Sequence, residues 1–234
     1  MSEPKFVKNS LIFFVFPIIQ YFYCVIFLSD NLSFPALNNT DESGILAIGG
    51  DLSIERLKLA YRNGIFPWYS DGDPIVWYSP DPRMVLLPQD LRVSKSMRQL
   101  INSKKYKVTF NTAFESVISN CKSIDRSRQG EQSTWITSEM KEAYIALYRC
   151  GAAKSVEVWE GNELVGGLYG VEVGKVFCGE SMFSKVSNAS KLAFIKLVRQ
   201  KKYVLIDCQV YNPHLSTLGA KEVKRDDFLK FLNQ

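Results

Sequence analysis

The stretch between residues 155 and 210 constrains the fold more than any other part of the sequence. Its apolar residues fall in short runs separated by glycine-containing turns, which predicts a meander of three strands. The expected elements are strands 155–159, 164–171 and 175–183, a helix from residue 187 or 188 to about 201, and a strand 203–210. Strands followed by a capped helix and a further strand favour an α+β domain, in which ligands bind at strand ends.

The remaining elements are expected to be short. Ser53 is suited to cap a helix that ends before Gly64, and Thr137 or Ser138 is suited to cap another. Residues 66–82 contain four prolines and many aromatic side chains, so this segment is predicted to be a loop. The other predictions are helices 54–63, 94–101, 113–121 and 138–150, strands 84–87 and 106–110, and a last amphipathic segment over 225–232.

Composition excludes several classes of protein. The 234 residues are 46% hydrophobic and 23% charged, which is typical of a globular protein and excludes a disordered chain or a coiled coil. The five cysteines form no Cys-x-x-Cys pair, which favours a reducing compartment. His214 is the only histidine, so a multi-histidine metal site is excluded. The sequence also lacks GxxxxGK[ST], GxGxxG and GxSxG motifs and therefore indicates neither a metal nor a recognisable cofactor.

Basic residues are concentrated in one segment. Residues 92–128 contain nine lysines and arginines against Glu115 and Asp125, a net charge of +7 in a chain whose total is +5. Such a local excess on a body of small net charge favours binding of a polyanion. The alternative is a solvated face without a partner.

The N-terminal region contains an uncharged apolar run. Residues 11–28 carry no charge, and Lys5 and Lys8 precede them. The length is at the lower limit for a membrane span, and Pro17 and Gln20 interrupt the run. Three interpretations are open: a signal anchor, a strand or helix of the fold, or upstream sequence translated from an incorrectly assigned start.

Three polar side chains interrupt apolar strands. Asp207 and Gln209 flank Cys208, and strand alternation places both on the face opposite this cysteine. Glu180 lies in a second apolar strand, directly after Gly179. Buried polar groups are costly unless they are hydrogen-bonded. These residues therefore form either a satisfied structural set or a chemical site.

Three tryptophans stand beside polar or turn-forming residues, at Trp68, Trp77 and Trp135. Each is either a core residue or a platform for ligand. Aromatic side chains combined with basic residues are typical of proteins that stack the bases of single-stranded RNA.

Long motifs in a fixed order relate the sequence to a known family. They are GILAIGGDLS (44–53), RNGIFPWYSDGDPIVWYSPDPR (62–83), TWIT (134–137), SVEVWEGNELVGGLYGVEVGKVFCGESMFS (155–184), NASK (188–191), LIDCQV (205–210) and HLSTLGAKEV (214–223). With these motifs the sequence resembles the leucyl/phenylalanyl-tRNA–protein transferase family from about residue 31 to residue 234.

The resemblance implies an enzyme that moves leucine or phenylalanine, and methionine more weakly, from aminoacyl-tRNA to the N-terminal arginine or lysine of a protein. This modification marks the acceptor for degradation by the N-end rule pathway. A cytoplasmic monomer with no cofactor and no membrane role is expected. The implied fold is α+β, with a hydrophobic leader over 1–30 outside the match, a small N-terminal α/β domain over 31–81 and a GNAT-like (acyl-CoA N-acyltransferase-like) catalytic domain over 82–234.

The resemblance also assigns roles to individual residues. Asp207, Gln209 and Glu180 are the expected catalytic residues. The amino-acid pocket is expected to be lined by Leu168, Phe177, Met182, Phe194, Leu197 and Ile206, the terminal adenosine to be held by Trp68 and Trp135 with Tyr144 nearby, and the acceptor stem to be bound by Arg92, Lys95 and Arg98.

Two other functions stay open on the sequence alone. A GNAT-like fold is compatible with an N-acetyltransferase that uses acetyl-CoA, although the sequence lacks the [QR]xxGx[GA] loop that binds pyrophosphate in such enzymes. A non-catalytic RNA-binding module would keep the basic and aromatic residues but would not need Glu180, Asp207 and Gln209.

Overall fold

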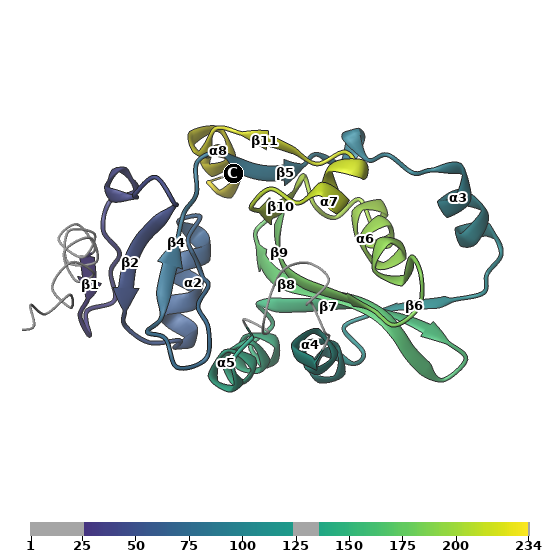
Figure 1. Ribbon diagram of the computed structural model, residues 1–234, viewed down its shortest axis with the longest axis horizontal. Coiled ribbons are helices and arrows are strands. Elements are labelled where there is room, and N and C mark those ends of the chain that lie inside the picture. The colour runs from purple at the N-terminus through teal and green to yellow at the C-terminus, as the bar shows by residue number, and fades with distance from the viewer. Residues whose placement is uncertain (1–25, 124–135, 234) are drawn as a thin grey trace, which may run out of the picture.

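The computed structural model describes residues 26–123 and 136–233, which form two β-sheets and the helices that cover them (Figure 1). The strands are β1 (Ile26–Leu28), β2 (Ile45–Gly49), β3 (Phe66–Pro67), β4 (Val76–Tyr78), β5 (Arg83–Leu86), β6 (Lys107–Phe110), β7 (Ala153–Glu160), β8 (Glu163–Val173), β9 (Val176–Ser184), β10 (Leu205–Gln209) and β11 (Lys221–Val223). The helices are α2 (Ile54–Arg62), α3 (Lys95–Asn102), α4 (Phe114–Ser123), α5 (Ser138–Arg149), α6 (Ala189–Arg199), α7 (Pro213–Thr217) and α8 (Arg225–Leu232), with short 3-10 turns at Leu37–Asn39 and Pro88–Asp90.

The first part of the chain builds a small sheet with the strand order β1-β2-β4-β3. Helix α2 lies beside it (Figure 1). The helix begins where the sequence predicts, because the Ser53 side chain accepts a hydrogen bond from the backbone N–H of Arg56. It ends before Gly64, which has a φ of +71° that glycine adopts without strain.

The second part builds a seven-stranded sheet in the order β11-β5-β10-β9-β8-β7-β6. The meander predicted from residues 155–183 is confirmed as β7, β8 and β9, which pair antiparallel in sequence order. Strand β10 joins β9 in parallel and β5 antiparallel. Mixed pairing of this kind, with helices on both faces, confirms the α+β class.

Alternating side chains of the large sheet build two cores. On one face, Tyr169 and Cys178 belong to the apolar cluster that includes α4 and α5. On the other face, Leu168 and Phe177 pack with α6. Figure 1 shows α4 and α5 below the sheet and α6 above it. The period of two along β8 and β9 therefore decides which residues meet which helices.

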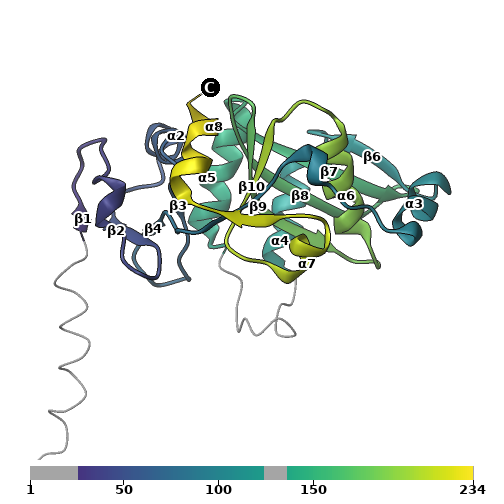
Figure 2. The same cartoon turned by 90° about the horizontal axis from the view of Figure 1, so that it is seen from above.

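Side chains of the small sheet belong to the same apolar core as α4 and α5. Trp77 on β4 is fully buried in the same cluster as α5, and its indole N–H donates to the carbonyl oxygen of Gly49 at 2.8 Å. Of its two possible roles, Trp77 is thus a core residue. Figure 2 shows the small sheet at one end of the long axis and α3 at the opposite end.

The segment 66–82 differs from its prediction as a loop, because it contains β3 and β4. Both strands are very short, and Pro67 lies in the two-residue edge strand β3, where a missing N–H does no harm. The prolines therefore limit the length of these strands without preventing them.

The apolar N-terminal run is described only at its end. Ile26–Leu28 forms β1 and pairs in parallel with β2, so these three residues are part of the fold. Residues 1–25 lie outside the described part of the chain. None of the helices within the described ranges has the length and hydropathy of a membrane span.

Candidate active site

A cavity of about 540 Å³ opens where two parallel strands diverge. Strands β9 and β10 pair only from Leu205–Val176 to Asp207–Cys178, and beyond this point β10 leaves β9. The space between them is closed by β3, α6 and α7. The residues that line it are Phe66, Pro67, Trp68, Leu168, Tyr169, Phe177, Gly179, Glu180, Ser181, Met182, Phe183, Ser184, Ser190, Phe194, Ile206, Asp207, Cys208, Gln209, Val210, Tyr211, Asn212, His214 and Leu215. Strand ends are where sequence reasoning expects a ligand.

The three expected catalytic residues lie together at the polar end of this cavity. Glu180 accepts hydrogen bonds from Nε2 of Gln209 at 2.7 Å and from the hydroxyl of Tyr144 at 2.8 Å. The hydroxyl of Tyr61, which comes from α2, is hydrogen-bonded to that of Tyr144. The chain of contacts therefore runs from the small-sheet layer through α5 into the cavity.

Asp207 is bound by a residue that the sequence analysis did not single out. Arg83 donates from Nε to Oδ1 at 2.8 Å and from Nη2 to Oδ2 at 2.7 Å. Arg83 also donates to the carbonyl oxygen of Gly64 and stacks between the rings of Phe66 and Phe228. A bidentate pair with this shielding is among the stronger polar contacts in proteins.

Burial sets the electrostatics of the cluster. Removal from water raises the pKa of Glu180 to about 7, although hydrogen bonds from Tyr61, Tyr144 and Gln209 act against this rise and Asp207 adds to it. Burial also raises the pKa of the two phenols well above the usual value. Burial acts to lower the pKa of Arg83, but the paired carboxylate outweighs it and the pKa is raised.

Gln209 reaches Glu180 because the strand is irregular at this point. Gln209 has a φ of +64°, and the pairing register with β5 shifts between Asp207 and Gln209. The backbone N–H of Gln209 donates to Oδ1 of Asp207 at 2.9 Å. Simple alternation is therefore wrong here. Cys208, expected on the opposite face, also lines the cavity, and burial raises the pKa of its thiol well above the usual value.

The opposite end of the cavity is apolar. It is lined by Leu168, Phe177, Met182, Phe194 and Ile206. Leu197, the sixth residue expected there, is buried on α6 but packs within the core and not along the cavity wall. Leu197 lies about one turn further along α6 than Phe194, beyond the α6 residues Ser190 and Phe194 that line the cavity.

The residues expected at the adenosine lie in different places. Trp68 stands at the cavity with 38% of its surface exposed, in tilted contact with Tyr78. Tyr144 is fully buried and contacts Glu180 instead of lining the cavity. Trp135 lies outside the described residues.

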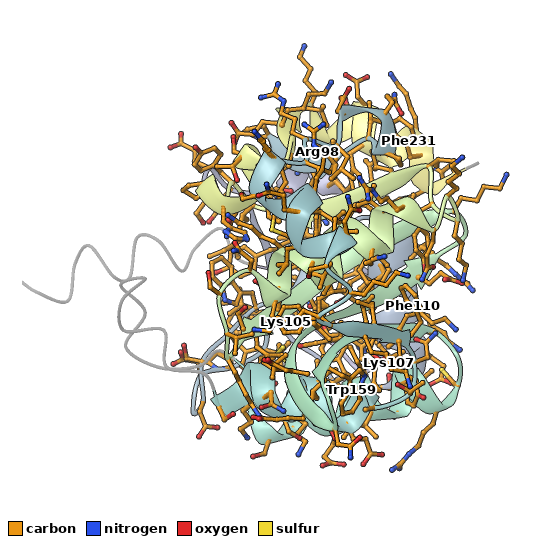
Figure 3. All side chains as sticks on the ribbon, turned by 90° about the vertical axis from the view of Figure 1, so that its right-hand side faces the viewer. Arg98, Lys105, Lys107, Phe110, Trp159 and Phe231 are labelled. Atoms are coloured by element: carbon orange, nitrogen blue, oxygen red, sulfur yellow. The ribbon has the colours of Figure 1, made fainter. Side chains whose placement is uncertain are left out.

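The expected tRNA-binding residues lie on and beside α3. Arg92, Lys95 and Arg98 are all exposed. Figure 3 shows Arg98 on the same face of the molecule as Lys105 and Lys107, at the end remote from the small sheet. Part of the basic segment is thus gathered on one surface.

Two polar residues that contact the site from behind the cavity wall were not identified from the sequence. Nothing in the sequence around Arg83 and Tyr61 indicates a role at the site. That role is visible only from their contacts with Asp207 and Tyr144, which are distant in the sequence. The available signal was the position of Arg83 at the end of the 62–83 motif and of Tyr61 directly before it. In the described ranges, no cluster of three or more histidine, cysteine or acidic side chains could hold a metal ion.

Comparison with known proteins assigns this architecture and cavity to a family. Residues 85–233 match the family model described as leucyl/phenylalanyl-tRNA protein transferase, and residues 50–81 match the model of that family's N-terminal domain. The chain is therefore an aminoacyltransferase. It belongs to the leucyl/phenylalanyl-tRNA–protein transferase family, which confirms the family and the enzyme class expected from the motifs.

Similar proteins cover nearly the whole chain. A leucyl/phenylalanyl-tRNA–protein transferase of Flavobacterium johnsoniae is 57% identical over 209 residues, which are 88% of this chain and 98% of that protein. One from Pectobacterium carotovorum is 50% identical over 213 residues, 88% of each protein.

Two solved structures show a weaker similarity. FemX is 10% identical, covers 77% of this chain and 71% of its own, and has a TM-score of 0.46. A GCN5-related N-acetyltransferase from Kribbella flavida is 12% identical, covers 68% and 56%, and has a TM-score of 0.35. The α+β assignment rests on the sheet topology itself.

Proposed function

We propose that this enzyme transfers leucine or phenylalanine, and methionine more weakly, from aminoacyl-tRNA to the N-terminal arginine or lysine of acceptor proteins. The observation that supports this most is the division of one cavity into an acidic end at Glu180 and an apolar end at Phe177 and Ile206. Such a cavity suits two reactants, one with a cationic terminus and one with an apolar side chain. The cellular role would be N-end rule degradation in the cytoplasm, by a monomer.

The apolar end suits the side chain of the donor amino acid. An apolar pocket favours leucine and phenylalanine over polar side chains, although it separates similar apolar ones by only about 1–3 kcal/mol. Trp68, and Trp135 with it, would stack on the terminal adenine, since base stacking needs an exposed aromatic face. Arg92, Lys95 and Arg98 would contact the phosphates of the acceptor stem.

The polar end suits the acceptor. An N-terminal arginine or lysine has a cationic side chain and an α-amine with a pKa near 8, so a usable neutral fraction of the amine exists at pH 7. Glu180 places a carboxylate at this end, and Asp207 lies beside it, paired with Arg83. Because Nε2 of Gln209 donates to Glu180, Oε1 of the same amide is the atom that would accept a hydrogen bond from the amine.

The reaction itself asks mainly for alignment. The donor is an activated ester, and correct placement of an ester and an amine contributes several kcal/mol to the barrier reduction.

We also propose that the boundary between the two domains falls at Asp81, between the small sheet, which ends at Tyr78, and the large sheet, which begins at Arg83.

The test is a transfer assay with a matrix of donors and acceptors. Leu-, Phe-, Met- and Ala-tRNA, and in a separate arm acetyl-CoA, are each combined with peptides that begin with arginine, lysine or alanine. We expect transfer from Leu- and Phe-tRNA to the arginine and lysine peptides, weak transfer from Met-tRNA and none from Ala-tRNA. Transfer from acetyl-CoA, or tRNA binding without any transfer, would instead support an N-acetyltransferase or an RNA-binding module.

A further inference from the structure

The two carboxylates at the polar end of the cavity have different surroundings. Both oxygens of Asp207 are engaged within the protein. Oδ1 accepts from Nε of Arg83 and from the backbone N–H of Gln209, and Oδ2 accepts from Nη2 of Arg83. The Asp207 side chain is 0% exposed. Asp207 therefore orients the backbone of Gln209 and balances the charge of Arg83, but its oxygens are not presented to a ligand.

Within residues 26–123 and 136–233, the hydrogen-bond partners of the Glu180 carboxylate are neutral. Its carboxylate accepts from the amide of Gln209 and the phenol of Tyr144, and it lines the cavity. Among the described residues no lysine, arginine or histidine forms an ion pair with it, and the nearby guanidinium of Arg83 is bound to Asp207. A carboxylate held by neutral donors at the edge of a cavity is free to take up a proton.

We propose that Glu180 is the catalytic proton acceptor of the transfer reaction and that Tyr61 is a positioning residue, which acts on Glu180 through Tyr144. This assignment rests on the proposed function. It gives different tasks to the two carboxylates, because Asp207 serves the architecture of β10 while Glu180 exchanges a proton with the substrates.

The proposed step balances without a co-reactant. The lone pair of the neutral acceptor amine forms the new C–N bond with the aminoacyl carbonyl carbon, and the ester C–O bond to the terminal ribose breaks. Glu180 takes one proton from the amine nitrogen and returns it to the ribose oxygen that leaves. The carboxylate is then back in its starting state, and the products are an amide and a free ribose hydroxyl.

The surroundings of Glu180 suit this task. A pKa raised by burial to about 7 makes the carboxylate a stronger base than an ordinary glutamate and keeps a large ionised fraction at neutral pH. The titratable or charged groups around it are Tyr61 on α2, Tyr144 on α5 with Tyr169 of β8 against its ring, Cys178 on its own strand, Asp207 on β10 and Arg83 on β5. Of these, only Arg83 is cationic, and it is paired.

Tyr61 links the site to the small sheet. It is buried on α2, and its hydroxyl bonds that of Tyr144, which in turn donates to Glu180. Hydrogen bonds to a carboxylate stabilise its ionised form. Loss of the Tyr61 hydroxyl should therefore leave Glu180 in place but make it harder to ionise.

The experiment measures single-turnover transfer of leucine from Leu-tRNA to an arginine-initiated peptide between pH 5.5 and 8.5. The variants are Glu180→Gln, Tyr61→Phe and, as a matched control, Tyr148→Phe, which removes a phenol hydrogen bond to Asn111 on the outer side of α5. In parallel, infrared difference spectra of each protein against Glu180→Gln follow the ionisation of this carboxyl group directly, without substrate.

We expect Glu180→Gln to lower the rate at least about 100-fold, within the range for loss of a general base. In Tyr61→Phe the rising part of the pH profile and the infrared midpoint should both move upward by about 0.5 unit or more, and the rate should recover at high pH. Tyr148→Phe should match the wild type. A structural role for Tyr61 would instead lower the rate equally at every pH.

Two results would overturn the assignment and leave the proposed function standing. One is a transfer rate for Glu180→Gln within about threefold of the wild-type rate, because loss of a general base causes a far larger decrease. The other is an infrared midpoint in the range of an exposed glutamate that Tyr61→Phe does not move. Absence of any transfer by a wild-type protein whose Glu180 titrates near neutrality would overturn the proposed function, and the proton-acceptor role with it.

Discussion

Arg83 and Asp207, 124 positions apart in the chain, form a bidentate ion pair with contacts of 2.8 and 2.7 Å, and their side chains are 1% and 0% exposed. The pair joins β5 to β10 at the point where the cavity opens. It fixes the backbone of Gln209 through the second hydrogen bond to Oδ1 of Asp207. The geometry of the polar end therefore depends on a contact that no local pattern in the sequence contains.

Removal of one partner should be costly for stability. Asp207→Ala leaves a buried guanidinium without its counter-ion, and we expect a loss of about 3–5 kcal/mol in the free energy of unfolding. The exposed pair of Lys221 and Asp90 offers a control, since Asp90→Asn should cost less than about 1 kcal/mol. Urea unfolding of both variants measures this. Equal losses would contradict the assignment of Arg83 and Asp207 as a structural pair.

The stability of the protein should depend on pH through Glu180. Its pKa is raised on folding from 4.5 to about 7, chiefly by burial, so the folded state holds the proton more tightly than the unfolded state does. The stabilisation is complete below pH 4.5 and is lost as the pH rises through about 7. Relative to Glu180→Gln, wild-type stability should fall by at most about 3 kcal/mol over this window. Parallel stability curves for the two proteins would contradict this pKa.

The apolar end of the cavity should control the choice of amino acid. Met182→Ala removes part of the wall, and leucine should lose more contact than phenylalanine does. We expect the ratio of kcat/KM for leucine over phenylalanine to fall about tenfold. Leu197→Ala is the control. It should lower the free energy of unfolding by about 2–5 kcal/mol because it leaves a cavity in the core, but it does not change the cavity wall and should leave the ratio unchanged. A ratio that moves equally in both variants would count against this location of the pocket.

Trp68 should contribute to donor binding and little to folding. It lies at the cavity and is 38% exposed, so Trp68→Ala should raise the KM for aminoacyl-tRNA about tenfold, the loss expected for one stacked base. Trp68→Phe should retain most of the affinity. Trp159→Phe, which removes a hydrogen bond to Thr109, lies away from the cavity lining and should leave this KM unchanged. An unaltered KM in Trp68→Ala would remove Trp68 from the donor site.

Most elements were predictable because their signals are local. The cap at Ser53, the stop at Gly64 and the turns of the meander each depend on a few neighbouring residues, and the structure has them within one or two positions. The separation of Leu168 and Tyr169 onto opposite faces of β8 likewise follows from strand alternation.

The details of the site were less predictable, because they depend on tertiary contacts. Alternation fails at Gln209, where a positive φ turns the side chain towards Glu180. A buried arginine such as Arg83 is rare, so its sequence neighbourhood gives no reason to place it in the interior. The hydrogen bond between Tyr61 and Tyr144 joins helix α2 to helix α5, and the two residues lie 83 positions apart in the sequence.

The most direct test of the account is the mass of an arginine-initiated peptide after incubation with Leu-tRNA and the enzyme. The account predicts that wild-type protein adds one leucyl residue to the N-terminus of the peptide and that Glu180→Gln, folded and still able to bind tRNA, adds it at least about 100-fold more slowly. A peptide that stays unmodified with the wild-type protein, or one that gains leucine equally well with Glu180→Gln, would contradict it.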